Sequence, residues 1–193
     1  MRGRAVAHGA ITIVNAIASY KGAALGIDLK TTAEVELIEG GDEIEVEIVD
    51  HPDEDRGLAV KAVEAVFERF GVEGLGARVR TWSDIPIAKG LKSSSVASNA
   101  IVLAATSALG RNLEDLAALN MGVEASIRAG VSITGAFDDA SASYFGGVVV
   151  TDNLKRMILR REKLPSGLRV LLYTPPGKVY TVSVDTNRLR SLG

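Results

Sequence analysis

A serine-rich loop between a predicted strand and a predicted helix is the strongest chemical feature of the sequence. Residues 86–97 read PIAKGLKSSSVA, with a glycine at the turn and three serines where an apolar helix would begin. Such a helix N-terminus has unpaired N–H donors and a partial positive charge, which suit phosphate. Lys89 and Lys92 add formal positive charge beside the serines. These residues predict either a phosphate-binding loop or a serine-capped helix preceded by a polar loop.

Neither of two common glycine fingerprints for nucleotide phosphates is present. No Gly-x4-Gly-Lys-Ser/Thr pattern occurs anywhere in the chain, so the serine-rich loop is not a Walker loop. Gly74 and Gly76 lack the third glycine of a dinucleotide fingerprint and precede a predicted strand. We interpret them as an ordinary turn after a helix.

Two adjacent carboxylates form the second chemical feature. Asp138 and Asp139 lie within residues 134–147 (TGAFDDASASYFGG), a stretch of small residues that ends in two glycines. In a phosphoryl transfer, one carboxylate can accept the proton of the acceptor hydroxyl and another can bind Mg²⁺. Neighbouring side chains seldom point the same way, so we expect the two aspartates to have different roles. An Asp-rich turn or a helix cap is the alternative.

Other polar residues give weaker signals. Asn15 lies inside an apolar run and must find a hydrogen-bond partner, either in the backbone or in a ligand. His8 and His51 form no ligand cluster with carboxylates in the sequence. Glu124, on the helix predicted before the aspartate pair, could reach a metal or remain an exposed charge.

Composition limits the classes of function. The 193 residues include 22 Lys+Arg and 24 Asp+Glu, and this balance argues against nucleic acid and anionic membranes as partners. The absence of cysteine excludes thiolate zinc sites, iron–sulfur clusters and disulfide scaffolds. No apolar window is long enough to cross a bilayer, and no clean cleavage region follows the N-terminal apolar stretch. We therefore expect a soluble cytoplasmic protein.

Hydrophobic periodicity predicts the elements that must position these residues. Alternation over residues 34–38 and 44–48, around Gly40 and Gly41, predicts an antiparallel hairpin. Three- and four-residue spacing predicts helices over about 60–70, 94–109 and 112–128, the last one capped by Asn112. Further strands are predicted at residues 77–82, 148–151, 157–160, 168–173 and 179–184. The expected fold class is α+β, with a largely antiparallel sheet and helices on one face.

Taken together, the two motifs resemble those of the GHMP kinase superfamily. Its phosphate loop reads P-x3-G-L-G/S-S-S-small, and residues 86–95 match it apart from Lys92. Its second motif, small-Gly-x-Asp followed by Gly-Gly, places Asp139 at the catalytic carboxylate with Asp138 beside it. The resemblance implies a ribosomal-protein-S5-like, ATP-binding N-terminal domain over residues 1–153. Residues 154–193 would then be the start of a truncated C-terminal domain.

Within the superfamily, the details are similar to those of archaeal-type shikimate kinases. The similar stretches are residues 12–18, 22–29, the serine-rich loop and residues 133–147. The resemblance implies ATP-dependent phosphorylation of the shikimate 3-hydroxyl, in aromatic amino-acid biosynthesis. One alternative is another small-molecule kinase of the superfamily, acting on homoserine, mevalonate or pantoate. A second alternative is a non-catalytic nucleotide-binding module.

The resemblance also implies roles for individual residues. Asp139 would orient or deprotonate the acceptor hydroxyl, and Asp138 would support metal or substrate. Ser94 would help to hold Mg²⁺, with Glu124 as a candidate carboxylate ligand. The ATP phosphates would contact Lys89, Gly90, Leu91, Lys92, Ser93, Ser94 and Ser95. Shikimate would contact Asn15, Thr134 and Gly135.

The sequence departs from the family pattern in three places. Lys92 stands where the family usually has Gly or Ser, so its charge could contact phosphate or point to solvent. Val96 replaces the usual small residue at the helix start, which predicts tighter packing there. No third glycine-rich motif follows, so we expect an N-terminal fragment whose exposed domain face could support self-association.

Overall fold

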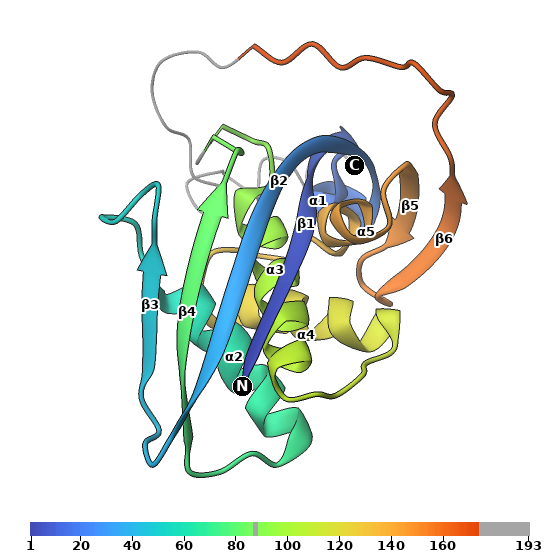
Figure 1. The fold of residues 1–193 in the computed structure, drawn as a ribbon. Helices are drawn as coiled ribbons and strands as arrows, with labels where there is room; N and C mark the ends of the chain where they lie inside the picture. The colour runs from blue at the N-terminus through green and yellow to red at the C-terminus, as the bar shows by residue number, and fades with distance from the viewer. Residues whose placement is uncertain (87–88, 174–193) are drawn as a thin grey trace.

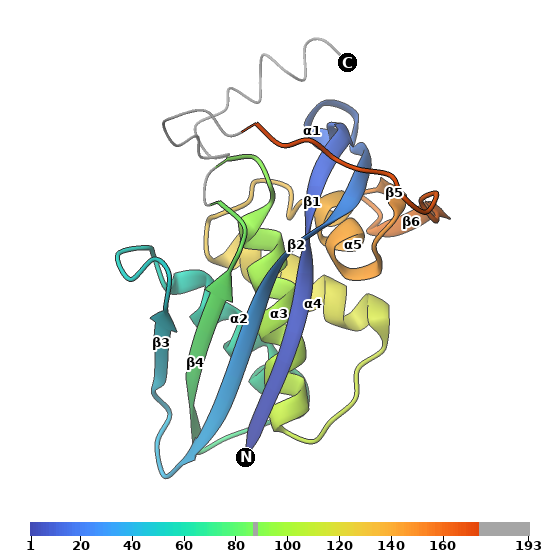
Figure 2. The same cartoon turned by 45° about the horizontal axis from the view of Figure 1, so that its top comes forward.

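The computed structural model describes residues 1–86 and 89–173 of the chain (Figure 1). In chain order the elements are β1 (Arg2–Val14), α1 (Ala16–Ser19), β2 (Lys21–Glu39), β3 (Ile44–Ile48), α2 (Gly57–Phe70), β4 (Leu75–Ser83), α3 (Ser93–Ala108), α4 (Asp115–Arg128), α5 (Phe137–Phe145), β5 (Val148–Asp152) and β6 (Met157–Glu162). All six strands join one sheet, and α2, α3 and α4 lie on the same side of it (Figures 1 and 2). The predicted α+β class, with a mostly antiparallel sheet and helices on one face, is confirmed.

The 19-residue strand β2 links the two ends of the sheet. Strand β1 pairs with β2 in the antiparallel direction along most of the length of β2. On the opposite edge, the second half of β2 pairs with β4, whereas residues 21–25 of its first half pair with β5. Strand β6 then pairs with β5, which gives the order β3-β4-β2-β5-β6. Residues of β1 and β2 can therefore contact elements from both halves of the fold.

The predicted hairpin between residues 34–38 and 44–48 is wrong. Strand β4 lies between these segments, antiparallel to β2 and parallel to β3. Parallel neighbours need a long crossover connection, and here α2 supplies it between β3 and β4. Gly40 does turn the chain with a φ of 79°, but the chain moves away from β2 instead of pairing with it. Alternation of polar and apolar residues shows which face of a strand is exposed to solvent, but it does not show which strand lies beside it.

The open face of the sheet carries rows of alternating charge. In one row, Arg2 pairs with Glu36 at 3.0 Å, Glu36 with Arg78 at 3.8 Å, and Arg78 with Glu45 at 2.8 Å. A neighbouring row contains the ion pairs of Arg4 with Glu34 and of Arg80 with Glu47. Exposed pairs of this kind add little to stability, because water and salt screen them. Their main consequence is that this face stays in water while the other face is covered by helices.

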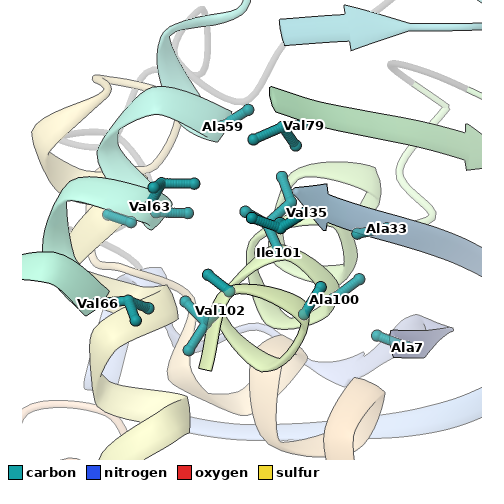
Figure 3. Close-up of a cluster of buried hydrophobic side chains, with 14 of the residues drawn as sticks. Ala7, Ala33, Val35, Ala59, Val63, Val66, Val79, Ala100, Ile101 and Val102 are labelled. Atoms are coloured by element: carbon teal, nitrogen blue, oxygen red, sulfur yellow. The ribbon is translucent and has the colours of Figure 1, made fainter. Parts of the chain in front are cut away.

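The core lies between the inner face of the sheet and the helices α2 and α3 (Figure 3). Val35 and Val79 point inward from β2 and β4, and they meet Val63 of α2 and Ile101 of α3. Small residues let α3 approach β1 closely. A Cβ atom built on Gly3 would lie 2.2 Å from the Ala104 carbonyl oxygen. This close approach fixes α3, and with it the serine-rich loop, against the N-terminal strand.

The three predicted helices are present, as α2, α3 and α4. Helix α2 ends at Phe70, as predicted, and its C-cap residue Gly71 has the left-handed conformation. Helix α4 starts at Asp115 after Glu114, so the prediction of Asn112 as its N-cap is wrong. The sequence did not predict α5, and the aspartate pair lies in its first turn. Because α5 is short and rich in Ala and Ser, it has no clear apolar stripe.

The predicted strands at residues 77–82, 148–151 and 157–160 are confirmed as β4, β5 and β6. Residues 168–173 form no strand, and the strand predicted at 179–184 lies outside the described residues. The domain boundary after residue 153 stays a prediction, and β6 pairs with β5 in the same sheet beyond it. Within the described ranges, no helix is long and apolar enough to span a bilayer.

Replacing Gly3 by Ala should destabilise the fold, because the new methyl group would meet the backbone of α3. We expect the free energy of unfolding to fall by about 1–3 kcal/mol, the usual cost of overpacking a core. Gly41→Ala is the matched control, since nothing lies within 4 Å of the added atom. Urea denaturation should show a control change within about 0.5 kcal/mol. Equal midpoints for the two variants would contradict the close approach of β1 and α3.

Candidate active site

A cavity of about 580 Å³ brings the serine-rich loop and the aspartate pair together. Its lining includes residues of β1, the β1–α1 turn, the start of α3, the stretch 129–134 and the start of α5, together with Asp50, His51, Glu54 and Asp55. Nine predicted site residues line it: Asn15, Gly90, Lys92, Ser93, Ser94, Ser95, Thr134, Asp138 and Asp139. The volume lies within the range of pockets for small ligands. The two motifs therefore belong to one site.

The serine-rich loop leads directly into α3. Ser93, Ser94 and Ser95 form the first residues of this helix and line the cavity. The N-cap residue is Lys92, and no side chain caps the helix. The alternative of a serine-capped helix is therefore wrong. The positive end of α3 and its serine hydroxyls face the space where an anion could bind.

Two residues predicted in this loop do not line the cavity. The side chain of Leu91 is only 6% exposed and packs into the core, where it anchors the loop. Lys89 is partly buried and is not one of the residues that line the cavity. Residues 87–88 lie outside the described part of the chain. Val96 is fully buried one turn into α3, and the tighter packing predicted there stays a prediction.

Asp139 is buried at the point where three elements converge. The residue is 5% exposed and lies in the first turn of α5. Its Oδ2 atom lies 3.0 Å from the Lys92 ammonium nitrogen, and Thr12 Oγ1 of β1 donates to Oδ1 at 3.4 Å. Lys92 therefore contacts a carboxylate, which was neither of the two alternatives predicted for its charge.

The pKa of Asp139 is raised from 3.8 to about 7, chiefly by burial and next by the neighbouring charge of Asp138. The Lys92 ammonium and the Thr12 hydroxyl act in the opposite direction. Burial prevails because a desolvated carboxylate loses most of its hydration, which one ammonium and one long hydrogen bond replace only in part. A carboxyl group with a pKa near neutrality is suited to accept a proton from a hydroxyl group.

Asp138 faces a different set of partners, as expected for adjacent side chains. Asn153, just after β5, donates to Asp138 Oδ1 at 2.8 Å, and Thr151 donates to the Asn153 side-chain oxygen at 2.7 Å. On the other side is β2, where a Cβ atom on Gly22 would lie 2.5 Å from Asp138 Oδ2. Asp138 is therefore held between β2 and the end of β5.

Sequence reasoning missed three residues that position the aspartates, namely Thr12, Gly22 and Asn153. Thr12 and Gly22 lie in stretches that carry the family resemblance, and this was the only available signal for them. Nothing around Asn153 marks it, because its contact with Asp138 exists only when β5 pairs with β2.

The residues predicted to bind substrate divide into two groups. Asn15 accepts a hydrogen bond from Ile17 N at 2.8 Å and caps α1, so its partner is the backbone, although it also lines the cavity. Thr134 lines the cavity as well. Gly135 does not, and its φ of 77° lets the chain turn where a Cβ atom would lie 2.4 Å from Val123 of α4. Gly135 therefore has a packing role.

Glu124 is not brought to the cavity. Its carboxylate pairs with Arg156 at 3.1 Å and with Arg128 at 3.7 Å. Among the residues that the structure describes, no cluster of three or more His, Asp or Glu could hold a metal ion alone. The cavity does contain serine hydroxyls and carboxylates, which are hard oxygen donors. They fit a Mg²⁺ ion that keeps water and phosphate ligands, which is how this ion is commonly bound.

Comparison with known proteins agrees with this geometry. Residues 57–147 match the family described as "GHMP kinases N terminal domain". The chain is 50% identical over 191 residues to a protein named shikimate kinase from Methanosarcina mazei, covering 99% of this chain and 64% of the relative. A shikimate kinase from Methanothermobacter thermautotrophicus is 46% identical, with 95% of this chain and 63% of the relative covered. The chain thus spans less than two thirds of the length of these relatives.

Solved structures show the same fold at low sequence identity. The mevalonate kinase of Methanococcus jannaschii has a TM-score of 0.69 at 16% identity, covering 86% of this chain and 56% of that one. A galactokinase of Lactococcus lactis complexed with galactose has a TM-score of 0.66 at 19% identity, covering 87% and 48%. Over residues 57–147 the chain therefore matches the N-terminal domain of the GHMP kinases, and its fold is the one found in solved structures of such kinases. By sequence it is similar to proteins named shikimate kinase from archaea.

The raised pKa of Asp139 predicts how stability depends on pH. A carboxyl group whose pKa is about 7 when folded and near 3.8 when unfolded stabilises the folded state while it is protonated. This contribution is complete below about pH 4 and is lost as the pH rises through 7. We expect Asp139→Asn, which is always neutral, to gain stability relative to the natural protein over this interval. Urea denaturation at pH 4.5 and 7.5 measures the difference, and a constant difference would contradict the raised pKa.

Proposed function

We propose that the protein containing this chain transfers the terminal phosphoryl group of ATP to the 3-hydroxyl group of shikimate. The observation that carries the proposal is the 3.0 Å contact between Lys92 of the serine-rich loop and Asp139 of α5. A candidate base next to a candidate phosphate site is what a phosphoryl transfer to a hydroxyl group would need, and the contact supports the proposal in this way. The identity of about 50% to archaeal shikimate kinases supports the choice of acceptor.

The nucleotide phosphates would lie at the N-terminus of α3. There the backbone N–H groups, the hydroxyls of Ser93, Ser94 and Ser95 and the Lys92 ammonium are available to anionic oxygens. Leu91 holds the loop in place through its buried side chain. Phosphoryl transfer needs chiefly positioning and neutralisation of charge, and this part of the cavity would supply both.

Asp139 would act on the acceptor. The 3-hydroxyl oxygen would bond to the terminal phosphorus as the bond from that phosphorus to the bridging oxygen breaks, so that ADP leaves. The hydroxyl proton would pass to Asp139, whose pKa of about 7 lets it hold that proton at neutral pH. Asp138, Asn15 and Thr134 line the same cavity and would contact the remaining groups of the acceptor.

Mg²⁺ bound with ATP would neutralise phosphate charge, and Ser94 is the residue of the serine-rich loop that we assign to it. Glu124 is engaged by Arg128 and Arg156 away from the cavity, so the geometry does not support it as the carboxylate ligand.

A panel of acceptors tests this function. The full-length natural protein should release ADP from Mg·ATP with shikimate, and much more slowly with homoserine, mevalonate, pantoate or no acceptor. A preference for another acceptor would keep the kinase mechanism and replace the substrate. Tight binding of ATP with no turnover on any acceptor would favour a nucleotide-binding module instead.

Asp139→Asn should lower kcat by about 10²–10⁴-fold, because the variant cannot accept the hydroxyl proton. The affinity for ATP should change much less, since the amide keeps the size of the side chain. Steady-state kinetics and calorimetric ATP binding separate the two effects. Comparable losses in turnover and in binding would argue against Asp139 as the base.

Ser94→Ala should chiefly impair the use of Mg·ATP. We expect the Mg²⁺ concentration that gives half-maximal activity to rise, because one oxygen ligand is lost. Ser107→Ala, at the other end of α3 and exposed, is the control for general effects on this helix. An unchanged Mg²⁺ dependence of Ser94→Ala would contradict the assignment.

A further inference from the structure

The backbone of Lys92 adopts a conformation that favours glycine. Its φ of 64° and ψ of 30° lie in the left-handed region, where the Cβ atom of an ordinary residue is crowded. The GHMP motif usually has Gly or Ser at this position, so a smaller residue would fit. A long cationic side chain held at a strained position points to a role for the side chain itself.

The ammonium group of Lys92 is directed inward. The side chain is 24% exposed, and its nitrogen lies 3.0 Å from the buried Oδ2 of Asp139. Lys92 is the only lysine or arginine among the described residues that line the cavity. The same lining contains five carboxylates, those of Asp50, Glu54, Asp55, Asp138 and Asp139. Any anion in this cavity therefore depends strongly on this one ammonium for charge compensation from the lining.

We propose that Lys92 is a positioning residue that links the base to the phosphoryl group. Its ammonium holds the Asp139 carboxylate with one N–H donor and offers the others to the phosphoryl group that is transferred. This inference rests on the proposed kinase function and adds a role that the phosphate-binding assignment of the loop does not contain.

The physical reason is the repulsion between two anions. A carboxylate base and the terminal phosphate of ATP must both lie next to the same hydroxyl oxygen, and both are negative. An ammonium between them offsets this repulsion and keeps the carboxylate aligned. The other phosphates of the nucleotide would lie on the loop itself. The affinity for ADP should therefore depend little on the Lys92 side chain.

The test compares three substitutions in the full-length protein. Lys92→Gly relieves the backbone and removes the ammonium. Lys92→Gln keeps a polar hydrogen-bond donor on a side chain one atom shorter, without the charge, and Lys92→Arg keeps the charge. We expect Lys92→Gly and Lys92→Gln to lower kcat by about 10²-fold or more, as for loss of a preorganised charge donor. The kcat of Lys92→Arg should be at least about tenfold higher than that of these two variants. Circular dichroism confirms folding, and Lys92→Gln carries the test where Lys92→Gly does not fold.

Nucleotide affinities give a readout that does not require turnover. Calorimetry with Lys92→Gln should show weaker binding of a non-hydrolysable ATP analogue and ADP affinity within about twofold of the natural protein. A merely structural residue would leave kcat of the Gly variant within threefold, and this result would overturn the inference. Equal losses for ADP and the ATP analogue would overturn it too, because they indicate a general phosphate ligand.

The inference and the proposed function fail in different ways. If the natural protein phosphorylates no acceptor in the panel, the kinase function is contradicted. If it phosphorylates shikimate but the Lys92 variants keep full activity, only the role of Lys92 is contradicted.

Discussion

The burial of Asp139 beside Lys92 is the constraint on which the site depends. A carboxyl group excluded from water is costly to ionise, and a single ammonium compensates for only part of that cost. The result is a carboxyl group whose pKa lies near 7 instead of near 4. Its partners come from β1, the serine-rich loop and α5, so the packing of these three elements sets both the position and the proton affinity of the group.

The fold serves this convergence by bringing backbones unusually close together. Gly3 lets β1 approach α3, which carries the serine-rich loop, and Gly22 makes room for Asp138 beside β2. Because β2 pairs with β1, β4 and β5, the position of α5 relative to the loop is fixed through the sheet as well as through helix packing. In the described part of the chain, charged rows lie on the open face of the sheet and the main hydrophobic core lies on the helical face.

Local sequence located the residues of the candidate site better than it predicted the connections between strands. The serine-rich loop and the aspartate pair were identified from residue types and spacing, since both features are contiguous in the chain. The pairing of β3 with β4 was not predictable from alternation, which carries no information about a strand's neighbour. The partners of the aspartates, Lys92 and Asn153, depend on long-range packing that leaves no local pattern.

The most direct test of the account is the ionisation of Asp139 itself. Carbon-13 NMR of the carboxyl group, assigned by its absence in Asp139→Asn, would follow its titration in the folded protein. The account predicts a midpoint near pH 7, as the burial and the neighbouring charge of Asp138 require. A midpoint near pH 4 would show an ordinary carboxylate at this position and would contradict a buried base poised to take a proton at neutral pH.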